Sequence, residues 1–486
     1  MFTILHISDL HRSRDEPVDN DTLIAALLAD CDRYITETPI VPRPDAIVVS
    51  GDIIQGAPIG HPNWQAIMRE QYEVAHAFLD QLVKRFLDGD RSRLILIPGN
   101  HDVCWNTSFF AMERVPGSEY PADVRSALVQ PDSVFRWSWK ERLLYRIKDA
   151  RLYGQRLDAY WEFVRKFYEG IPLIVPIDPS RGYQLFELCD GKIVIAAFDS
   201  VTGNDCFGYS GAIPRGAVAR ADLMLRDRNH SYALRIATWH HSIQGPPLRD
   251  DYMEVGQVHE MAGLHFQLGM HGHQHVAAAT THYVHLSESQ SMAVVSAGSL
   301  CAGSKELPRG VNRQYNVIVI EDDFRRARVH VREAVEGEQF SRKTSGGFPE
   351  GYVEVSWQAP IDIMGREIDP NLENTRRAVL QAEDALNSGD PREALNILRD
   401  VELTPDSYAR KIAIKAASIL DDPHLSAATI DKPFSEDEAI LLILALLRIG
   451  DVNGAARSLD DWPDMDAAIR KEIEGRIENK RAMRAE

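Results

Sequence analysis

Five short apolar runs in the first 275 residues each end beside a residue that can bind a metal ion. They cover 2–8, 46–50, 93–98, 232–239 and 266–270. The runs are rich in Ile, Val and Leu, as strands buried on both faces of a sheet are. Ligands of open α/β sheets bind outside the carboxyl ends of the strands. The pattern therefore predicts an α/β fold in which five loops meet at one edge.

The side chains that follow these runs are carboxylate, imidazole and amide groups. They are Asp9, His11, Asp52, Asn100, His240, His273 and His275. Such ligands suit hard or borderline divalent cations, and two cations about 3.5–4 Å apart can activate water and stabilise an in-line displacement at phosphorus. Core packing does not explain the set, because clustered carboxylates and imidazoles are costly to bury unpaired. Glycines beside Asp52, Asn100 and His273 would allow tight turns and close approach to the ions.

The motifs occur in a fixed order along the chain. They read Asp9-Leu10-His11, Gly51-Asp52, Gly99-Asn100-His101-Asp102, His240 and Gly272-His273-Gln274-His275. This series resembles the calcineurin-like metallophosphoesterase superfamily, whose pattern is D-x-H, G-D, G-N-H-D/E, H and G-H-x-H. The resemblance implies an α/β fold with two mixed sheets packed face to face and helices outside, a four-layer αββα sandwich. It covers a predicted domain at 1–340.

The resemblance also divides the predicted ligands between two divalent metal ions. One ion is expected at Asp9, His11 and His275. The other is expected at Asn100, His240 and His273. Asp52 would bridge the two ions, because one carboxylate has two oxygens. Manganese is the favoured metal, and iron, zinc, nickel and cobalt also fit these ligands.

Two residues of the third motif are expected to act in catalysis. The resemblance places His101 against the substrate, where it protonates the leaving oxygen or stabilises the phosphoryl charge. Asp102 either orients His101 through a hydrogen bond or caps the helix that follows. His240 and His241 are adjacent, and only one should face the metals. The resemblance selects His240 and leaves His241 behind the ligands or against the phosphate.

An aromatic and basic insertion, at about 105–180, separates the third and fourth motifs. Its apolar spacing predicts two amphipathic helices with a break near Gly154, although Trp137 and Trp139 would alternate faces on a strand. If the insertion forms a cap over the predicted metal site, its aromatic rings would stack on bases and its arginines would pair with phosphates. The alternative, favoured for most individual residues, is a helical hairpin with buried rings and solvated arginines.

The remaining chain predicts closing strands, a linker and an all-α domain. Two runs at 183–189 and 192–198 predict a β-hairpin, and strands are expected at 292–296, 314–320 and 327–331. Residues 341–370 are rich in Gly, Ser and Pro, which predicts a linker with one added strand.

Residues 371–486 are helical in pattern throughout. Asp390, Asp422 and Asp451 lie 32 and 29 residues apart, a period suited to helix–turn–helix repeats. The region weakly resembles tetratricopeptide-type solenoids, which present surfaces for a protein partner or for self-association. The alternative is a helical bundle that only supports the catalytic domain.

Charge, cysteine content and apolar stretches indicate the cellular compartment in which the chain is expected. A net charge of −18 disfavours non-specific binding to nucleic acid. The five cysteines are scattered and form no C-x-x-C, which indicates a reducing compartment. The first predicted strand begins at Phe2 and leaves no room for a signal peptide. The longest apolar stretch, 439–447, is too short to cross a bilayer. We expect a cytoplasmic protein that does not enter a membrane.

These observations favour a phosphoesterase in which a dimetal-bound hydroxide hydrolyses a phosphodiester or phosphomonoester. The acidic surface favours a nucleotide or cyclic nucleotide as substrate. The insertion and the helical tail favour the alternative, a DNA or RNA nuclease of the repair-exonuclease type. A third possibility is a non-catalytic scaffold that acts through its C-terminal domain, and the intact ligand set argues against it.

Overall fold

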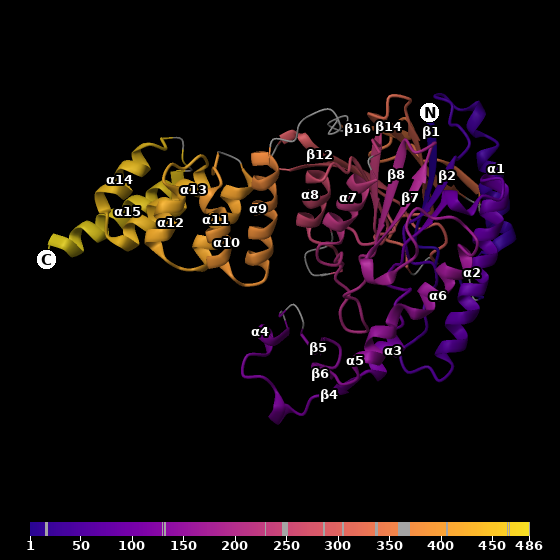
Figure 1. The fold of residues 1–486 in the computed structure, drawn as a ribbon, viewed down its shortest axis with the longest axis horizontal. Helices are drawn as coiled ribbons and strands as arrows, with labels where there is room; N and C mark the ends of the chain where they lie inside the picture. The colour runs from indigo at the N-terminus through magenta and orange to yellow at the C-terminus, as the bar shows by residue number, and fades with distance from the viewer. Residues whose placement is uncertain are drawn as a thin grey trace. The chain divides into compact units, whose positions relative to one another are not determined.

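The computed structural model forms two compact units, Met1–Asp362 and Ile363–Glu486. It describes residues 1–14, 18–128, 130, 133–228, 230–244, 251–284, 287–303, 306–335, 339–357, 370–404, 407–463, 465 and 467–485. Figure 1 shows sheets and helices in the first unit and helices alone in the second. Within these residues, no helix is both long enough and apolar enough to span a membrane.

The first sheet of the N-terminal unit carries the first three ligand motifs. Its strands are β1 (Phe2–Ile7), β2 (Ala46–Val49), β3 (Leu94–Leu96), β13 (Gln314–Ile320), β14 (Arg326–Val335), β15 (Gln339–Arg342) and β16 (Tyr352–Ser356). They lie in the order β15-β14-β13-β1-β2-β3, and β16 pairs with β14. Strands β1, β2 and β3 are parallel, whereas β13 runs antiparallel to β1. The parallel trio therefore ends at one edge.

The second sheet carries the last two ligand motifs. Its strands are β7 (Tyr183–Leu188), β8 (Ile193–Phe198), β9 (Leu234–Thr238), β10 (Leu268–His271), β11 (Ala278–Val284) and β12 (Ser287–Ser296). Their order is β11-β12-β10-β9-β8-β7. Strands β8, β9 and β10 are parallel. The predicted hairpin is confirmed, since β7 and β8 pair antiparallel from Leu188 and Ile193.

The two sheets share one hydrophobic core. Ile4 and Ile318 contribute from the first sheet, and Ile195, Ile236 and Met270 contribute from the second. Helices α1 (Asn20–Cys31) and α2 (Trp64–Phe86) lie beside the first sheet in Figure 1, and α7 (Ala217–Asp227) and α8 (Val255–Gly263) lie beside the second. The predicted αββα architecture is confirmed. All residues of β1, β2 and β3 are buried, which explains why these strands are apolar except for Thr3 and His6 of β1.

A buried ion pair joins α1 to β14 of the first sheet. Arg332 of β14 donates from Nε to Asp30 Oδ2 (2.7 Å) and from Nη1 to Glu37 Oε1 (2.6 Å). Arg332 is 1% exposed and Asp30 is fully buried. Tyr315 also donates its hydroxyl to Asp30. Loss of one partner would leave the others charged and unpaired inside the protein.

We expect Arg332→Met to lower the free energy of unfolding of the N-terminal unit by about 3–5 kcal/mol, the cost of breaking a buried pair from one side. Arg326→Met is the matched control, because Arg326 lies on the same strand with an exposed side chain. Urea unfolding of the two variants measures the difference. Equal stabilities would show that the pair contributes nothing beyond its packing.

The insertion is partly a sheet, which corrects the helical prediction for 143–147. It contains α3 (Trp105–Phe110), β4 (Met112–Arg114), α4 (Val124–Leu128), β5 (Phe135–Ser138), β6 (Leu143–Ile147), α5 (Ala150–Gly154) and α6 (Asp158–Phe167). Strand β6 pairs with β4 on one side and β5 on the other. The β5–β6 hairpin and the more distant β4–β6 pairing override the local helical periodicity. The break near Gly154 is present, because α5 ends there and α6 begins at Asp158.

The strand that was expected within residues 341–370 is present and belongs to the first sheet. Strand β16 pairs along β14, and Trp357 is 5% exposed. Its indole nitrogen donates to the Phe324 carbonyl at 2.7 Å. Residues 358–369 of the expected linker lie outside the described residues.

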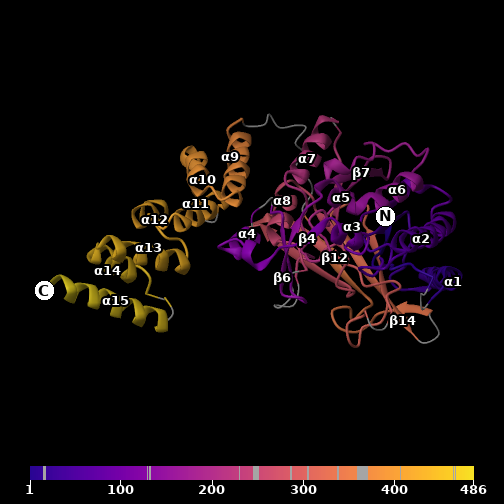
Figure 2. The ribbon, with the colours of Figure 1, turned by 90° about the horizontal axis from the view of Figure 1, so that it is seen from below.

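The C-terminal unit is helical, as predicted. Its helices are α9 (Pro370–Asn387), α10 (Pro391–Ile397), α11 (Tyr408–Ile419), α12 (Pro423–Ile430), α13 (Glu436–Ile449), α14 (Val452–Asp460) and α15 (Ala467–Ala485). Consecutive helices pack together (Figure 2). Asp390, Asp422 and Asp451 cap α10, α12 and α14 with their side chains, and Gly450 ends α13 in the left-handed region. Each of these aspartates therefore begins a helix directly after a turn.

Candidate dimetal centre

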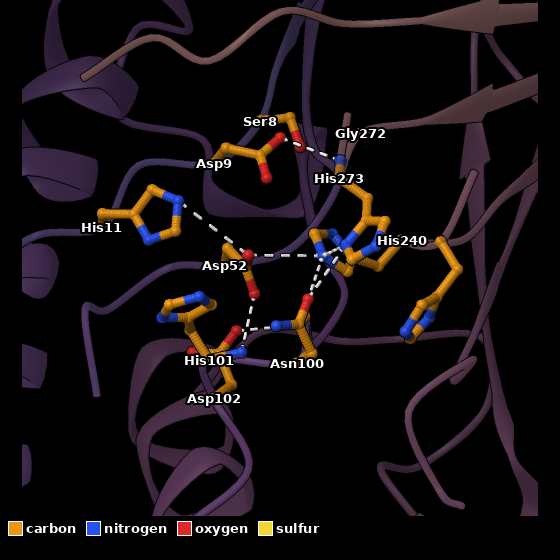
Figure 3. Close-up of polar contacts among 12 residues, drawn as sticks. Ser8, Asp9, His11, Asp52, Asn100, His101, Asp102, His240, Gly272 and His273 are labelled. Atoms are coloured by element: carbon orange, nitrogen blue, oxygen red, sulfur yellow. Dashed lines mark hydrogen bonds and ion pairs between the residues drawn. The ribbon is translucent and has the colours of Figure 1, made fainter. Parts of the chain in front are cut away.

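The structure brings all seven predicted metal ligands together at the ends of five strands. Figure 3 labels all of them except His275. Asp9 and His11 follow β1, Asp52 follows β2, Asn100 follows β3, His240 follows β9, and His273 and His275 follow β10. A hydrogen bond from the His273 backbone N–H to Asp9 Oδ2 (3.0 Å) joins the loops of the two sheets. The parallel strands of each sheet thus deliver their loops to one place.

Five of these residues have an unusual backbone conformation. Their φ angles are positive: Asp9 52°, His11 45°, Asp52 51°, His273 75° and His275 56°. Residues with a side chain rarely adopt this left-handed region, and each instance costs about 1–3 kcal/mol. Backbone bonds hold it in place, including those from Asp9 N–H to the Gly51 carbonyl and from His11 N–H to the Asp52 carbonyl. Strain concentrated on candidate ligands is a feature of functional sites.

Two glycines permit close contacts between the ligand loops. A Cβ atom on Gly99 would lie 2.1 Å from the backbone nitrogen of Asp52. A Cβ atom on Gly272 would lie 1.8 Å from Ser8 Oγ and 2.6 Å from Asp9 Oδ2. Only glycine fits at either position without displacing a ligand loop.

We expect Gly99→Ala to weaken metal binding by at least about tenfold, because the added methyl group must push the Asp52 backbone away from the cluster. Titration calorimetry with Mn²⁺ measures this loss. Gly117→Ala is the matched control, since a Cβ there meets nothing within 4 Å. Unchanged Mn²⁺ affinity in Gly99→Ala would mean that the loops tolerate the displacement.

The first donor cluster lies around Asp9. His275 Nε2 is 3.2 Å from Asp9 Oδ1 and 3.4 Å from His11 Nε2. His11 Nε2 in turn lies 3.9 Å from Asp52 Oδ2. Burial opposes ionisation of Asp9, yet the neighbouring His275 holds the pKa of this carboxyl below its usual range.

The second donor cluster lies around Asn100. Its Oδ1 atom is 3.0 Å from both His240 Nε2 and His273 Nδ1. Asp52 Oδ2 is 3.3 Å from His240 Nε2, so this one oxygen faces both clusters. Asp52 Oδ1 accepts the backbone N–H of His101 at 2.8 Å. Asp52 Oδ2 is therefore the oxygen that both donor clusters share in this structure.

The hydrogen bonds of the histidines fix which nitrogen faces each cluster. His240 Nδ1 lies 2.8 Å from the Ser50 carbonyl, and His275 Nδ1 lies 3.0 Å from the Glu306 carbonyl. A carbonyl can only accept, so each Nδ1 carries a proton, and in the neutral ring each Nε2 directs a lone pair into its cluster. Such second partners commonly orient metal-binding histidines.

The donor set fits divalent cations. Lone pairs of imidazole, amide and carboxylate converge at 3.0–3.3 Å, a repulsive arrangement unless positive charge lies between them. Asp9 Oδ1 and His11 Nδ1 are buried without a hydrogen-bond partner in the described chain. Burial lowers the pKa of His240, but the Asp52 carboxylate outweighs it and raises that pKa to about 9. The site therefore favours positive charge, and His240 binds a proton more tightly there than a histidine does in water.

His101 lies at the edge of the cluster. Its Nδ1 is 2.8 Å from the Gln55 carbonyl, which leaves Nε2 without the proton in the neutral ring. Its ring centroid lies 4.6 Å from that of His11, at 83°. His101 is also close enough to His11 and Asp52 to form a third possible ligand group with them. Geometry therefore allows contact with either an ion or a bound substrate.

Asp102 has neither of its expected partners. Its carboxylate accepts the backbone N–H groups of Gly99 (2.8 Å) and Ile53 (3.1 Å) and the hydroxyl of Tyr72 (3.1 Å). Helix α3 is capped instead by the Cys104 side chain. Burial, with Asp52 nearby, raises the pKa of Asp102 to about 7. Asp102 thus ties the loop after β2 to the loop after β3.

His241 lies behind the ligands, one of its two predicted positions. Its Nε2 is 3.1 Å from both Asn204 Oδ1 and the Tyr209 carbonyl, and its Nδ1 is 3.0 Å from Ser200 Oγ. Both ring nitrogens are occupied. His240, whose Nε2 lies 3.0 Å from Asn100 Oδ1 and 3.3 Å from Asp52 Oδ2, is the histidine that faces the cluster.

Sequence reasoning missed the groups that contact the outward-facing nitrogens of the candidate ligands and of His101. Three are the backbone carbonyls of Ser50, Gln55 and Glu306, which have no side-chain signature. The fourth is Asp251, whose Oδ2 lies 3.7 Å from His273 Nε2. An acidic residue after the fourth motif was its only signal.

Two mixed sheets between helices, with converging donors at the strand ends, define a metal-dependent phosphohydrolase. The family model for calcineurin-like phosphoesterases matches residues 2–277, and the chain belongs to this family.

Solved structures with low similarity include three phosphoesterases. A dimetal phosphatase from Danio rerio is 13% identical, with a TM-score of 0.39, and the match covers 74% of this chain and 99% of that one. The calcineurin-like phosphoesterase YfkN from Bacillus subtilis is 12% identical (TM-score 0.31; 70% and 87% covered). A 5'-nucleotidase from Candida albicans is 13% identical (TM-score 0.33; 65% and 46% covered). No curated protein sequence matches the chain.

Proposed function

We propose that this chain is a dimetal phosphoesterase that hydrolyses a phosphodiester or phosphomonoester of a nucleotide or cyclic nucleotide. One observation carries the proposal. Asp52 Oδ2 faces two donor clusters at once, lying 3.9 Å from His11 Nε2 and 3.3 Å from His240 Nε2. A shared carboxylate between two nitrogen- and oxygen-rich clusters supports a pair of adjacent cations.

The chain's own residues would divide the work as follows. Asp9, His11 and His275 would hold one ion, Asn100, His240 and His273 would hold the other, and Asp52 would serve both. The two ions, when bound, supply the Lewis acidity that activates water and neutralises charge on the phosphoryl oxygens. His101, held through Nδ1 by the Gln55 carbonyl, presents Nε2 to the leaving oxygen. As an imidazolium it donates the Nε2 proton to that oxygen.

The insertion gives limited support to the nuclease alternative. Arg136 pairs with the buried Asp205 at 2.6 Å, and Arg146 pairs with Glu113 at 2.6 Å. Arg156 donates to the backbone carbonyls of Asn204 and Thr202. Arginines with internal partners are poorly placed to neutralise a phosphate backbone, and the net charge is −18. A small nucleotide substrate is therefore the favoured reading.

The test compares metal-stripped protein with protein reloaded with Mn²⁺. We expect reloaded protein to hold two ions and to release p-nitrophenol from bis(p-nitrophenyl) phosphate, and stripped protein to be inactive. A panel of cyclic nucleotides beside labelled single- and double-stranded DNA and RNA identifies the substrate class. Faster cleavage of the polymers would favour the nuclease. A chain that binds no metal and turns over none of these compounds would instead support the scaffold.

A further inference from the structure

Trp105 lies beside His101, and Tyr209, from a distant part of the chain, lies beside Trp105. The Trp105 ring centroid is 5.7 Å from that of His101, with their planes at 45°. The Tyr209 ring lies 5.8 Å from Trp105, with their planes at 58°. Trp105 opens α3, and Tyr209 lies in the loop between β8 and α7. We name this pair, Trp105 and Tyr209, the aromatic wall.

The aromatic wall presents ring surface and few free polar groups. Tyr209 is 36% exposed, and Trp105 is half-buried. The Tyr209 hydroxyl already donates to the Cys206 carbonyl at 3.1 Å. The Trp105 indole nitrogen is buried and lacks a hydrogen-bond partner among the described residues. A ligand would therefore meet the wall through stacking and apolar contact.

The aromatic wall is anchored to the loops of the centre. The Tyr209 carbonyl lies 3.1 Å from His241 Nε2. The Cys104 N–H, just before α3, donates to the Arg156 carbonyl at 2.8 Å, and Arg156 Nε donates to the Asn204 carbonyl at 3.0 Å. The two segments that carry the wall are thus joined through Arg156. A wall fixed before binding loses little entropy when a ligand arrives.

We propose that the aromatic wall is a substrate subsite that stacks a planar ring, a nucleobase or an aryl group, carried by the phosphoester. The proposal rests on the phosphoesterase function, because the phosphate must lie at the dimetal centre beside His101 for its ring to reach Trp105. Stacking requires a flat π-face and no particular hydrogen-bond pattern. The wall therefore selects for a planar ring and discriminates weakly among bases.

The stacked ring lies away from the reacting phosphorus, so it contacts the wall equally in the ground state and the transition state. Such uniform binding lowers KM and leaves kcat unchanged. Loss of the wall is expected to raise KM for ring-bearing substrates and to leave KM for alkyl phosphoesters unchanged. This split separates a binding role from a structural role, which would lower activity towards both.

The experiment measures binding of phenylphosphonate and methylphosphonate to the Mn²⁺-loaded full chain by titration calorimetry. The two compounds share a phosphonate group and differ only in the ring. We expect the native chain to bind phenylphosphonate about tenfold more tightly. Trp105→Ala should abolish this preference, whereas Trp105→Phe should keep most of it. Trp139→Ala is the matched control, because Trp139 is 78% exposed in the insertion, and it should keep the native ratio.

The other possible results separate failure of the aromatic subsite from failure of the phosphoesterase function. Equal affinity of the native chain for both phosphonates, or a preference that survives in Trp105→Ala and Tyr209→Ala, would overturn the subsite and leave the phosphoesterase proposal standing. If neither compound binds and the Mn²⁺-loaded chain hydrolyses no phosphoester, the function itself fails and the subsite with it. Unchanged methylphosphonate affinity in the variants shows that the centre is intact.

Discussion

Asp52→Asn is expected to reduce phosphoester hydrolysis by about a thousandfold or more, because the site loses the charge that two adjacent cations would share. Asparagine tolerates the left-handed backbone that Asp52 adopts at φ 51°. Its amide oxygen can still accept the backbone N–H of His101. The substitution therefore removes charge and preserves the loop. Turnover of an aryl phosphodiester, with elemental analysis of bound metal after dialysis, measures both losses.

The chain offers a closely matched control for this variant. Asp190 has the same φ of 51°, and it lies in the turn between β7 and β8, away from the cluster. Asp190→Asn should keep native activity and native metal content. Undiminished turnover by Asp52→Asn would remove the shared carboxylate from the mechanism. Full metal occupancy with lost turnover would show that Asp52 serves chemistry and not metal binding.

Much of the fold could be predicted because strand burial is recorded locally in the sequence. The run at 314–320 coincides with β13, and the hairpin at 183–198 forms β7 and β8 as expected. In both cases, a short run of apolar residues indicates the strand and the turn residues beside it indicate where the strand ends. The helix predicted at 143–147 was wrong, because β6 forms through hydrogen bonds with its partner strands β4 and β5. Its partners at 112–114 and 135–138 leave no trace in the spacing within the strand.

In the candidate site, too, some features could be predicted from the local sequence and others depend on the fold. The candidate ligands were recognisable in the sequence, because imidazoles and carboxylates at strand ends have few structural explanations. Their orientation was not, because backbone carbonyls such as that of Gln55 decide which nitrogen of a histidine is free. Asp102 illustrates the difference. Its position beside His101 suggested a partnership, yet the fold turns its carboxylate to the backbone of Gly99 and Ile53.

His101→Ala is expected to lower kcat by about 10²–10⁴-fold, the usual contribution of a positioned general acid. The loss should be larger for an alkyl phosphodiester than for a p-nitrophenyl ester, since p-nitrophenolate leaves without a proton. Metal content should remain native, because the proposed ligand set does not include His101. Rates for both esters and elemental analysis of the same samples test these three expectations.

The control for His101→Ala is His230→Ala. The His230 ring also bonds a backbone carbonyl, that of Gly191 at 2.7 Å, but it lies exposed outside the cluster. Its replacement should leave kcat unchanged for both esters. If His101→Ala instead loses a metal ion, His101 belongs to the ligand group that it can form with His11 and Asp52. An equal loss for both esters with full metal content would assign His101 to charge stabilisation and not to proton donation, because only proton donation depends on the leaving group.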